Sequence, residues 1–407
     1  MTMDIPALRK KYSTISRGIN DDFINVHPIQ RGGVLTPEAQ KVLLEFGDGY
    51  SLCDQCLKGS LERIQKPPVG EFFEDFAKWV NMDHSFATGA ARHSKEIAFK
   101  VLKKLHPERN IVILDANAHY STFMALEENH LQPMEVPHNG KYAYKIILEK
   151  YEEKIDEVQE KTHELPLAVL LTHVDYQYGN YNDPEIVGKI CQKKGVTFVL
   201  NGAYSIGILP PPSCKSIGVD FLAASGHKSM ASSGPVGMIA FKEEYAAEVF
   251  AKSSITTDIT ERSWPNKYCH FLGCPPVYGA PLATLMASFP AVVERCLPAN
   301  AADESKKINF LIDEIKKIEG FSVHGVLPKI HPLTKVSMPA FAKIAETHPR
   351  KGFFVRDEFK KRGIIGMAPG ISKSMKINTY GLTWEQVKHI AWAFKDISSQ
   401  NGLTVKD

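Results

Sequence analysis

The residues best suited to chemistry follow one short apolar segment. Residues 221–224 predict a buried strand, and Ser225, His227 and Lys228 come directly after it. A lysine delivered at a strand end can form a Schiff base with an aldehyde cofactor, and serine and histidine beside it suit a phosphate group. Taken alone, the segment fits an ordinary surface lysine better. The other strand ends distinguish these two interpretations.

Three more apolar segments are followed by polar residues in the same way. They are 111–114 before His119 and Tyr120, 167–171 before His173, and 196–200 before Asn201. Ligands of open α/β sheets bind at the carboxyl ends of the strands. A single histidine at a strand end is usually part of the packing, but four polar ends in succession, the last carrying Lys228, indicate a common site.

The residue types at these strand ends fit a pyridoxal phosphate site. Residues 88–92 (Thr-Gly-Ala-Ala-Arg) open a predicted helix, where small residues and free amide groups suit a phosphate. The ring of His119 could lie on the face of the pyridine, and Asn201 would face the pyridine nitrogen. The predicted cofactor contacts are Ala91, Arg92, His119, His173, Asn201, Ser225, Gly226, His227 and Lys228.

The segments between the polar ends predict the elements that position them. Apolar strands alternate with helical stretches such as 184–194, which is typical of βα units and a largely parallel, buried sheet. A long apolar helix at 280–296 and a linker at 297–302 follow. The pattern then changes to helices at 308–318, 353–362 and 384–397, with strands near 321–326, 335–338 and 374–378.

This order of elements predicts an α/β fold with a large domain and a small one. The large domain would contain the mostly parallel sheet, and the small C-terminal domain would be α+β. We expect an N-terminal arm over 1–36, the large domain over 37–298 and the small domain over 299–407.

Composition narrows the class of protein further. The chain has 407 residues, 43% hydrophobic and 23% charged, which is usual for globular proteins with two domains. No apolar run approaches the ~18 residues of a membrane span, and the N-terminus lacks the layout of a secretory signal. We therefore expect a cytoplasmic protein with no membrane partner.

Charge is unevenly distributed along the chain. Residues 299–407 hold 18 Lys and Arg against 11 Asp and Glu, a surplus of +7, so the rest carries −4 of the net +3. A basic portion can attract a phosphate-bearing partner. A mixed, solvated surface explains the same residues slightly better, because many of the lysines lie among acids on amphipathic helix patterns.

The helix start, the strand ends and Lys228 together resemble the aspartate-aminotransferase-type fold, in the branch that contains cysteine desulfurases. One position departs from that pattern, because the superfamily usually has Asp where this chain has Asn201. Asp keeps the pyridine nitrogen protonated and the ring a strong electron sink. A neutral asparagine weakens the sink, which argues against transamination and is compatible with β-elimination of a good leaving group.

Several motifs are similar to those of the archaeal O-phosphoseryl-tRNA:cysteinyl-tRNA synthase family. They lie at 28–39, 46–56, 201–204, 226–230, 271–274 and 284–290, and in the smaller domain at 363–364, 369–370 and 379–383. The resemblance covers nearly the whole chain from about residue 28 onward. The Cys-x-x-Cys of Cys53 and Cys56, combined with Gly-His-Lys-Ser-Met at 226–230, is its most specific part.

The resemblance implies conversion of O-phosphoseryl-tRNA(Cys) to cysteinyl-tRNA(Cys), by β-elimination of phosphate and addition of sulfur. Lys228 would anchor the cofactor and then take the α-proton as general base. Arg92, His119 and Tyr120 would contact the phosphoserine and the cofactor. His173 and Asn180 are weaker candidates to line the same pocket.

Three cysteines would deliver the sulfur, namely Cys53, Cys56 and Cys274. A thiolate can carry a persulfide, which a neighbouring thiol releases by forming a disulfide. Three thiolates can instead hold an iron–sulfur cluster, and both interpretations stay open. A structural metal half-site at the Cys-x-x-Cys is less favoured, because no second such pair or paired histidine completes four ligands.

The implied partners are tRNA(Cys) carrying O-phosphoserine, a second copy in a homodimer, a phosphoseryl-tRNA synthetase and a sulfur-relay or scaffold protein. Two other functions explain parts of the sequence. One is a desulfurase or selenocysteine-lyase-like enzyme acting on a free amino acid, against which Asn201 and the distant Cys-x-x-Cys argue. The other is a catalytically silent tRNA or sulfur-relay scaffold, against which the intact Lys228 argues.

Overall fold

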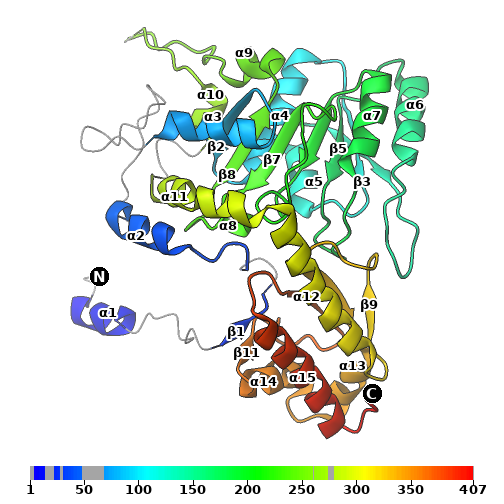
Figure 1. Ribbon diagram of the computed structural model, residues 1–407. Helices are drawn as coiled ribbons and strands as arrows, with labels where there is room; N and C mark the ends of the chain where they lie inside the picture. Colours follow the sequence, from blue (N-terminus) through cyan, green and yellow to red (C-terminus); the bar gives the residue numbers. More distant parts are fainter. Residues whose placement is uncertain are drawn as a thin grey trace.

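The computed structural model describes residues 4–13, 23–27, 31–47, 68–259, 261–273 and 279–406. These residues form two lobes, each with its own hydrophobic core, joined by the long helix α12 (Figure 1). The upper lobe holds the large sheet, and the lower lobe holds a small sheet with helices beside it.

The large sheet has seven strands in the order β2-β8-β7-β6-β5-β3-β4. All neighbours from β4 to β7 pair in parallel, and only β8 runs against its neighbours β2 and β7. The strands are β2 (His84–Thr88), β3 (Ile111–Asp115), β4 (Gln132–Val136), β5 (Ala168–Thr172), β6 (Phe198–Asn201), β7 (Phe221–Ser225) and β8 (Gly237–Phe241).

Helices cover this sheet and are connected to it by short loops. The helix α4 packs against β7 and β8, and α7 packs against β5 and β6. The upper-lobe helices are α2 (Pro37–Phe46), α3 (Val69–Trp79), α4 (Ala91–Leu105), α5 (Tyr120–Glu128), α6 (Lys150–Thr162), α7 (Pro184–Lys194), α8 (Gly226–Ser229), α9 (Ala246–Val249), α10 (Lys267–Leu272) and α11 (Gly279–Arg295), with the 3-10 turn η1 (Glu243–Tyr245).

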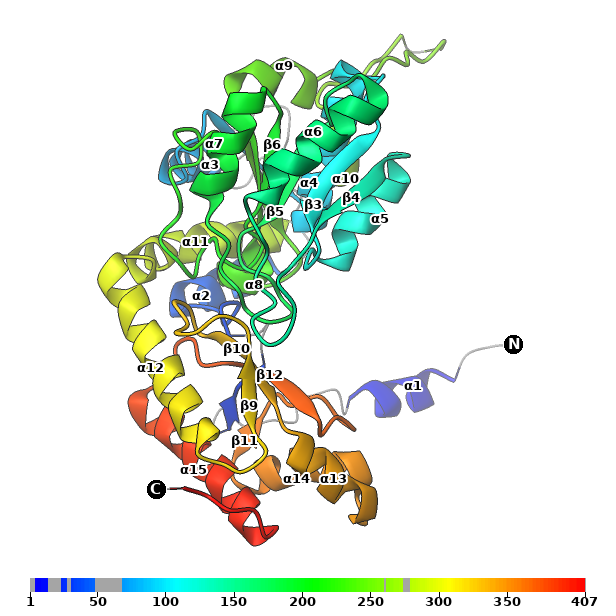
Figure 2. The same ribbon diagram turned by 90° about the vertical axis from the view of Figure 1, so that its right-hand side faces the viewer.

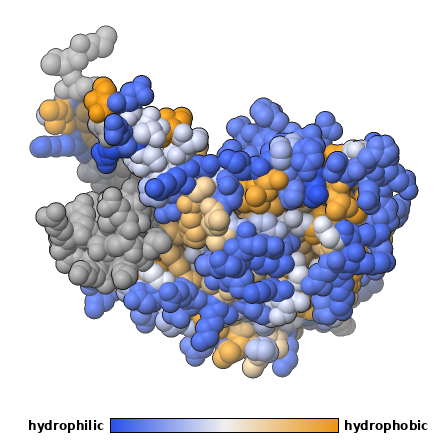
Figure 3. Space-filling model, turned by 90° about the horizontal axis from the view of Figure 1, so that it is seen from above, coloured by the Kyte–Doolittle hydropathy of each residue, from blue (hydrophilic) through white to orange (hydrophobic). Residues whose placement is uncertain are grey.

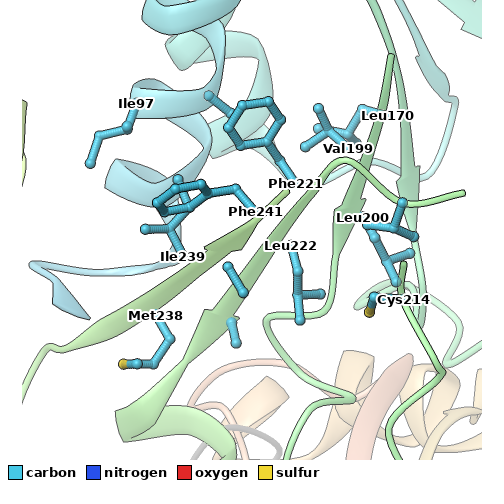
Figure 4. Close-up of a cluster of buried hydrophobic side chains, with 14 of the residues drawn as sticks. Ile97, Leu170, Val199, Leu200, Cys214, Phe221, Leu222, Met238, Ile239 and Phe241 are labelled. Carbon is cyan, nitrogen blue, oxygen red and sulfur yellow. The ribbon is translucent and has the colours of Figure 1, made fainter. Parts of the chain in front are cut away.

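The core of the upper lobe lies between α4 and the central strands. Figure 4 shows Ile97 of α4 close to Phe221 and Phe241, with Leu170 and Val199 beyond them. Every residue of β5, β7 and β8 is buried, as expected for strands covered on both faces. A rigid, dry sheet therefore supports the turns that follow its strands.

The lower lobe is built on a three-stranded antiparallel sheet in the order β12-β10-β9. Figure 2 shows α12 passing from the upper lobe along β9. The elements are α12 (Pro298–Lys316), β9 (Ser322–His324), β10 (Leu333–Ser337), α13 (Pro339–Thr347), η2 (Lys351–Phe353), α14 (Phe354–Lys361), β11 (Ile364–Ile365), β12 (Ser374–Asn378) and α15 (Trp384–Gln400).

The N-terminal part of the chain contributes to the lower lobe. The short strand β1 (Ile24–Asn25) pairs in parallel with β11, and Ile24 and Val26 belong to the lower core. A separate helix, α1 (Ile5–Tyr12), precedes it. The predicted N-terminal arm thus includes a strand, β1, that pairs with β11 in the lower lobe.

The predicted linker at 297–302 is wrong. Residues from Pro298 onward are helical and continue without a break into the segment expected as a separate helix from 308. Proline is favoured in the first turn of a helix, where its missing N–H has no intrahelical partner to lose. Pro298 therefore begins α12.

The described residues include no helix that is both long and apolar enough to cross a membrane. Seen from above, the face of the molecule is largely hydrophilic, with apolar residues in separate patches (Figure 3).

Candidate active site

The ends of four neighbouring strands meet at one edge of the large sheet. Since β3, β5, β6 and β7 lie side by side in parallel, the residues that follow them share that edge. A cavity of about 580 Å³ opens there between the two lobes. Its lining residues are His27, His119, Tyr176, Tyr204, Lys228, Leu333, Lys335, 366–369, Ile371 and 374–376.

Lys228 lies in α8, the single helical turn after β7, and reaches this cavity. The turn is fixed through the next residue, because Ser229 Oγ donates to Ile206 O (2.6 Å) and the guanidinium of Arg295 donates to Ser229 O. Burial, followed by the positive charge of Arg92, lowers the pKa of Lys228. Both effects favour the neutral amine, which is the nucleophilic and basic form.

His119 caps the first turn of α5 and faces Lys228 across the cavity. Its Nδ1 accepts from the backbone N–H of Ser121 (3.2 Å) and lies 2.8 Å from Ser121 Oγ. Burial and then the charges of Lys228, Lys95 and Arg92 lower its pKa to about 4. With Nδ1 occupied as an acceptor, the neutral ring carries its hydrogen on Nε2.

A buried lysine, Lys95, lies behind His119 and was not predicted. Its Nζ donates to Ser121 Oγ (3.0 Å) and Thr122 Oγ1 (2.7 Å), and only 2% of the residue is exposed. Burial, then the charge of Lys228, lowers its pKa to about 7. Below pH 7 Lys95 is mainly an ammonium, which can only donate, so Ser121 then accepts from Lys95 and gives its own hydrogen to His119 Nδ1. The sequence signal was present: Lys95 falls on the apolar face of α4, four residues after Ala91.

The start of α4 and the turn after β7 form a corner with open amide donors. Thr88 and Ser225 both pair with Gly237, the first residue of β8, so the two segments lie on either side of it. Ala90 caps α4 without any side-chain bond, so the amides of Ala91 and Arg92 have no capping side chain and could donate to a ligand, whereas His93 N already donates to Ala90 O (2.8 Å). Ser225 Oγ lies 3.3 Å from His227 Nδ1.

Arg92 and Ala91 begin α4 at this corner. Ala91 is buried, whereas the Arg92 side chain is exposed and outside the cavity lining. Its charge still depresses the pKa of Lys228, His227 and His119. This positive corner is suited to an anion such as a phosphate ester.

His173 and Asn201 lie at the middle of the sheet edge. His173 Nδ1 is 2.8 Å from Ser205 Oγ, and its buried Nε2 has no partner among the described residues. Burial lowers the pKa of His173 to about 4, so the ring is neutral. Asn201 Oδ1 accepts from Ala203 N (3.3 Å). The unpartnered Nε2 of His173 is a buried polar atom at the edge of the sheet that also carries the positive corner and Lys228, and this combination suits a polar, aromatic phosphate ester such as pyridoxal phosphate.

Of the predicted site residues that the structure describes, His119 and Lys228 line the cavity, whereas Tyr120 and Asn180, like the corner residues, His173 and Asn201, are not part of its lining. Tyr120 is 51% exposed, with its ring centroid 4.1 Å from that of His119. Asn180 is buried and braces loops, because its Nδ2 donates to Ala143 O (2.9 Å) and its Oδ1 accepts from Val326 N (2.7 Å). The cavity contains instead Tyr176 and Tyr204, which were not assigned a role from the sequence.

The three predicted sulfur-carrying cysteines, Cys53, Cys56 and Cys274, lie outside the described residues. The chain leading to the last of them is described: Gly273 bridges to Thr88, and Gly89 N donates to Leu272 O (3.0 Å). Burial raises the pKa of the Cys269 thiol to about 12, which disfavours the nucleophilic thiolate there. No group of metal-binding side chains occurs among the residues whose positions are described.

Comparison with known proteins identifies the family. The aminotransferase class-V model matches residues 69–346. An O-phospho-L-seryl-tRNA:Cys-tRNA synthase from Methanopyrus kandleri is 46% identical over 401 residues, which cover 97% of this chain and 99% of the relative. The chain belongs to the O-phospho-L-seryl-tRNA:Cys-tRNA synthase family. The resemblance inferred from the motifs is thereby confirmed.

Other relatives agree with this family. The synthase of Methanocaldococcus jannaschii is 44% identical and covers 95% of this chain and 98% of its own. A solved SepCysS–SepCysE N-terminal domain complex contains a chain 42% identical, with a TM-score of 0.84 and coverage of 96% and 99%. A NifS-like protein is 16% identical with a TM-score of 0.69 and shares the fold.

These matches confirm the predicted fold class, an aspartate-aminotransferase-type α/β fold. Membership of the class-V family identifies the protein as an enzyme that depends on pyridoxal phosphate. Lys228 and His119 in the cavity, together with the positive corner and His173 at the same edge of the sheet, are the residues whose chemistry suits that cofactor.

Proposed function

We propose that this protein converts O-phosphoseryl-tRNA(Cys) to cysteinyl-tRNA(Cys). The observation that carries the proposal is the cavity in which Lys228, with a lowered pKa, faces a neutral His119, in a chain of the O-phospho-L-seryl-tRNA:Cys-tRNA synthase family. When bound, pyridoxal phosphate supplies an electron sink that makes the α-proton of an attached amino acid acidic.

Each residue of the site would have a separate role in binding the cofactor or in catalysis. The α4 start, Ser225 and His227 would hold the cofactor phosphate, and Asn201 would face the pyridine nitrogen. Lys228 Nζ would anchor the cofactor and take the α-proton of the substrate. Because Asn201 cannot protonate the ring, the weakened sink suits elimination of a good leaving group.

The phosphate of the substrate would leave from the β-carbon with the bonding electron pair. The Nε2–H of His119 and the charge of Arg92 would stabilise this leaving phosphate. Sulfur would then form a bond to the same carbon, and Lys228 would return a proton to the α-carbon. We infer that sulfur is delivered by Cys53, Cys56 and Cys274, through either a persulfide or an iron–sulfur cluster.

Assembly and location are part of the proposal. A SepCysS chain was solved in complex with the N-terminal domain of SepCysE, which favours a protein partner here, and we propose that it is a sulfur-relay or scaffold protein. We propose that the protein forms a homodimer in the cytoplasm and that it also binds a phosphoseryl-tRNA synthetase. We also propose the division into an arm, a large domain over 37–298 and a small domain over 299–407, which the two separate hydrophobic cores support.

The decisive experiment follows the amino acid attached to the tRNA. Purified protein with O-phosphoseryl-tRNA and a sulfide source should produce cysteinyl-tRNA, and Lys228→Ala should abolish both the product and the visible absorbance of the bound cofactor. Free O-phosphoserine should be a poor substrate. Equal turnover of the free amino acid would reject the tRNA-dependent function and favour a desulfurase-like one.

A further inference from the structure

A group of aromatic and basic side chains from both lobes adjoins the cavity. We define the aromatic–basic rim as Tyr142, Tyr144, Tyr178, His324, Lys335 and Lys376. Two of these residues, Lys335 and Lys376, also line the cavity that contains Lys228. The tyrosines come from loops of the upper lobe, and the other three from β9, β10 and β12 below. The rim is therefore the surface next to the reacting end of a bound substrate.

The rings of the rim contact one another closely. Tyr144 and Tyr178 stack with centroids 4.0 Å apart and planes within 5°, and the His324 centroid is 5.6 Å from that of Tyr144. Tyr142 tilts against His324 at 6.0 Å and remains 65% exposed. Lys335 Nζ lies 4.8 Å from the Tyr178 centroid. The rim thus presents flat rings with positive charge beside them.

The loops that carry the tyrosines are held in place before any ligand binds. Asn117 Nδ2 donates to Tyr144 O (2.9 Å), and the buried Lys329 donates to the carbonyls of Tyr178 and Gly179 (both 2.8 Å). Gly325 N donates to Tyr142 O (3.0 Å), which ties the loop after β4 to the lower lobe, as its path in Figure 1 also shows. A surface already ordered loses little entropy on binding.

The positive charge of the rim is not neutralised within the part of the chain that the structure describes. Neither Lys335 nor Lys376 forms an ion pair with a described carboxylate; Lys376 donates to the Tyr176 carbonyl (3.1 Å). Asp175 is the carboxylate that acts on both lysines, but it is buried and accepts from the backbone of Gln177 (2.9 Å). Burial and then mutual repulsion lower the pKa of Lys376. An anionic ligand would relieve this repulsion.

We propose that the aromatic–basic rim binds the single-stranded 3′ end of the charged tRNA. The inference rests on the proposed function, because an amino acid esterified to tRNA can reach Lys228 only if the adjoining nucleotides pass the mouth of the cavity. Aromatic side chains stack on bases of any sequence, and lysines contact the phosphates of a single strand. A free amino acid would leave these side chains unused.

Binding of uncharged tRNA tests the rim independently of catalysis. The affinity of the full-length protein is measured for intact tRNA and for the same tRNA lacking its last three nucleotides. Removing these nucleotides should weaken binding to the unaltered protein at least about tenfold, since a single stacked base already contributes roughly 1–3 kcal/mol. In Tyr142→Ala the effect of trimming should shrink to about threefold or less, and in Lys335→Gln/Lys376→Gln it should disappear.

Two controls complete the design. Lys189→Gln removes an exposed lysine of α7 and should retain the full effect of trimming. In the double lysine variant, the slope of log affinity against log salt should also fall by about 0.7 for each lost phosphate contact. The inference is overturned if trimming does not weaken binding to the unaltered protein, or if both rim variants keep the tenfold difference. Conversion of O-phosphoseryl-tRNA in the same preparations would show that the proposed function survives that outcome.

Discussion

Lys95 contributes to the lowered pKa of His119, although it does not line the cavity itself. It reaches His119 through one hydroxyl group, that of Ser121, and its charge also opposes a second proton on the ring. The neutral ring of His119, with its hydrogen on Nε2, therefore depends on a chain of hydrogen bonds from Lys95 through Ser121 to His119. Such a positioning residue is expected to affect the pH dependence of the enzyme more than its substrate binding.

Replacing this lysine tests its role. Lys95→Met removes a positive charge, so the pKa of His119 should rise from about 4 and the acid limb of the kcat/KM profile should move to higher pH. Loss of the hydrogen bonds should lower kcat about 10- to 100-fold, corresponding to about 1.5–3 kcal/mol for bonds to a charged group. Lys104→Met, an exposed change on the same helix, should do neither. An unshifted acid limb in Lys95→Met would show that the lysine only fills space.

Cys56 gives a second prediction at this scale. Cys56→Ala should abolish sulfur transfer from a protein or persulfide donor but spare transfer from high concentrations of free sulfide, because only the donor route needs the thiolate. The measurement is cysteinyl-tRNA formed from each source, with Cys214→Ala, a buried thiol, as control. If Cys56→Ala loses both routes, the cysteine has a structural role.

Single site residues could be predicted where they directly follow strands that lie in parallel in one sheet. Lys228 and His119 each follow a strand of one sheet, and they meet in one cavity. Lys335 and Lys376 come from the other lobe, and nothing in the local sequence indicates that β10 and β12 close over the strand ends. Their contribution depends on tertiary packing between lobes.

At the scale of elements, the strand β8 and the helix α4 are fitted closely at the phosphate corner. A Cβ added to Gly237 would lie 2.4 Å from the carbonyl carbon of Ala90 and 2.6 Å from Ala91 N. Both are backbone atoms, so a side chain could be accommodated only by moving the start of the helix. Glycine at this position keeps the free amides of α4 close to the sheet.

The substitution Gly237→Ala should therefore loosen the cofactor. We expect affinity for pyridoxal phosphate to fall tenfold or more and the protein to be destabilised by about 1–3 kcal/mol, the usual cost of overpacking. Cofactor titration by absorbance and thermal unfolding are the measurements. Gly234→Ala is the matched control, because its Cβ would approach only Pro281, at 3.3 Å. Unchanged cofactor affinity in Gly237→Ala would show that this corner does not bind the phosphate of the cofactor.

Most central elements followed from sequence pattern, and most edge elements did not. The strands β3, β5, β6 and β7 and the helix α7 lie within two residues of their predicted bounds. They are buried, so apolar runs of strand length identify them. The strand β4 was missed because its residues are mostly exposed. The strand β8 was also missed, although it is a buried apolar run of strand length. The domain boundaries stay a prediction.

At the scale of the whole molecule, buried neutral histidines make stability depend on pH. Burial lowers the pKa of His331 to about 3 and of His173 to about 4, below the 6.5 of an exposed histidine. The contribution of these neutral histidines to the free energy of unfolding is complete above pH 6.5. It is lost as the pH falls toward their pKa values in the folded protein. At pH 5 each should cost about 2 kcal/mol of unfolding free energy. Asp115, with a pKa raised by burial to about 7, acts in the opposite direction.

The difference between variants isolates one histidine from these opposing effects. Relative to the unaltered protein, His331→Gln should lose about 2 kcal/mol less stability between pH 7.5 and pH 5, because glutamine does not titrate. Urea unfolding at the two pH values measures this. Surface His130→Gln should leave the pH dependence unchanged. Parallel curves for His331→Gln and the unaltered protein would contradict a neutral His331 in the folded state.

The pairing of β1 with β11 has a consequence for how the molecule is made. Ile24 leaves the ribosome 340 residues before its partner Ile364, which at about 5–20 residues per second is a delay of roughly 20–70 s. The seven-stranded sheet is complete in the nascent chain by then, but the segment around Ile24 still lacks its partner. The lower lobe, and with it the cavity between the lobes, must therefore form last. During synthesis, therefore, Lys228 has no enclosed site until the chain is nearly complete.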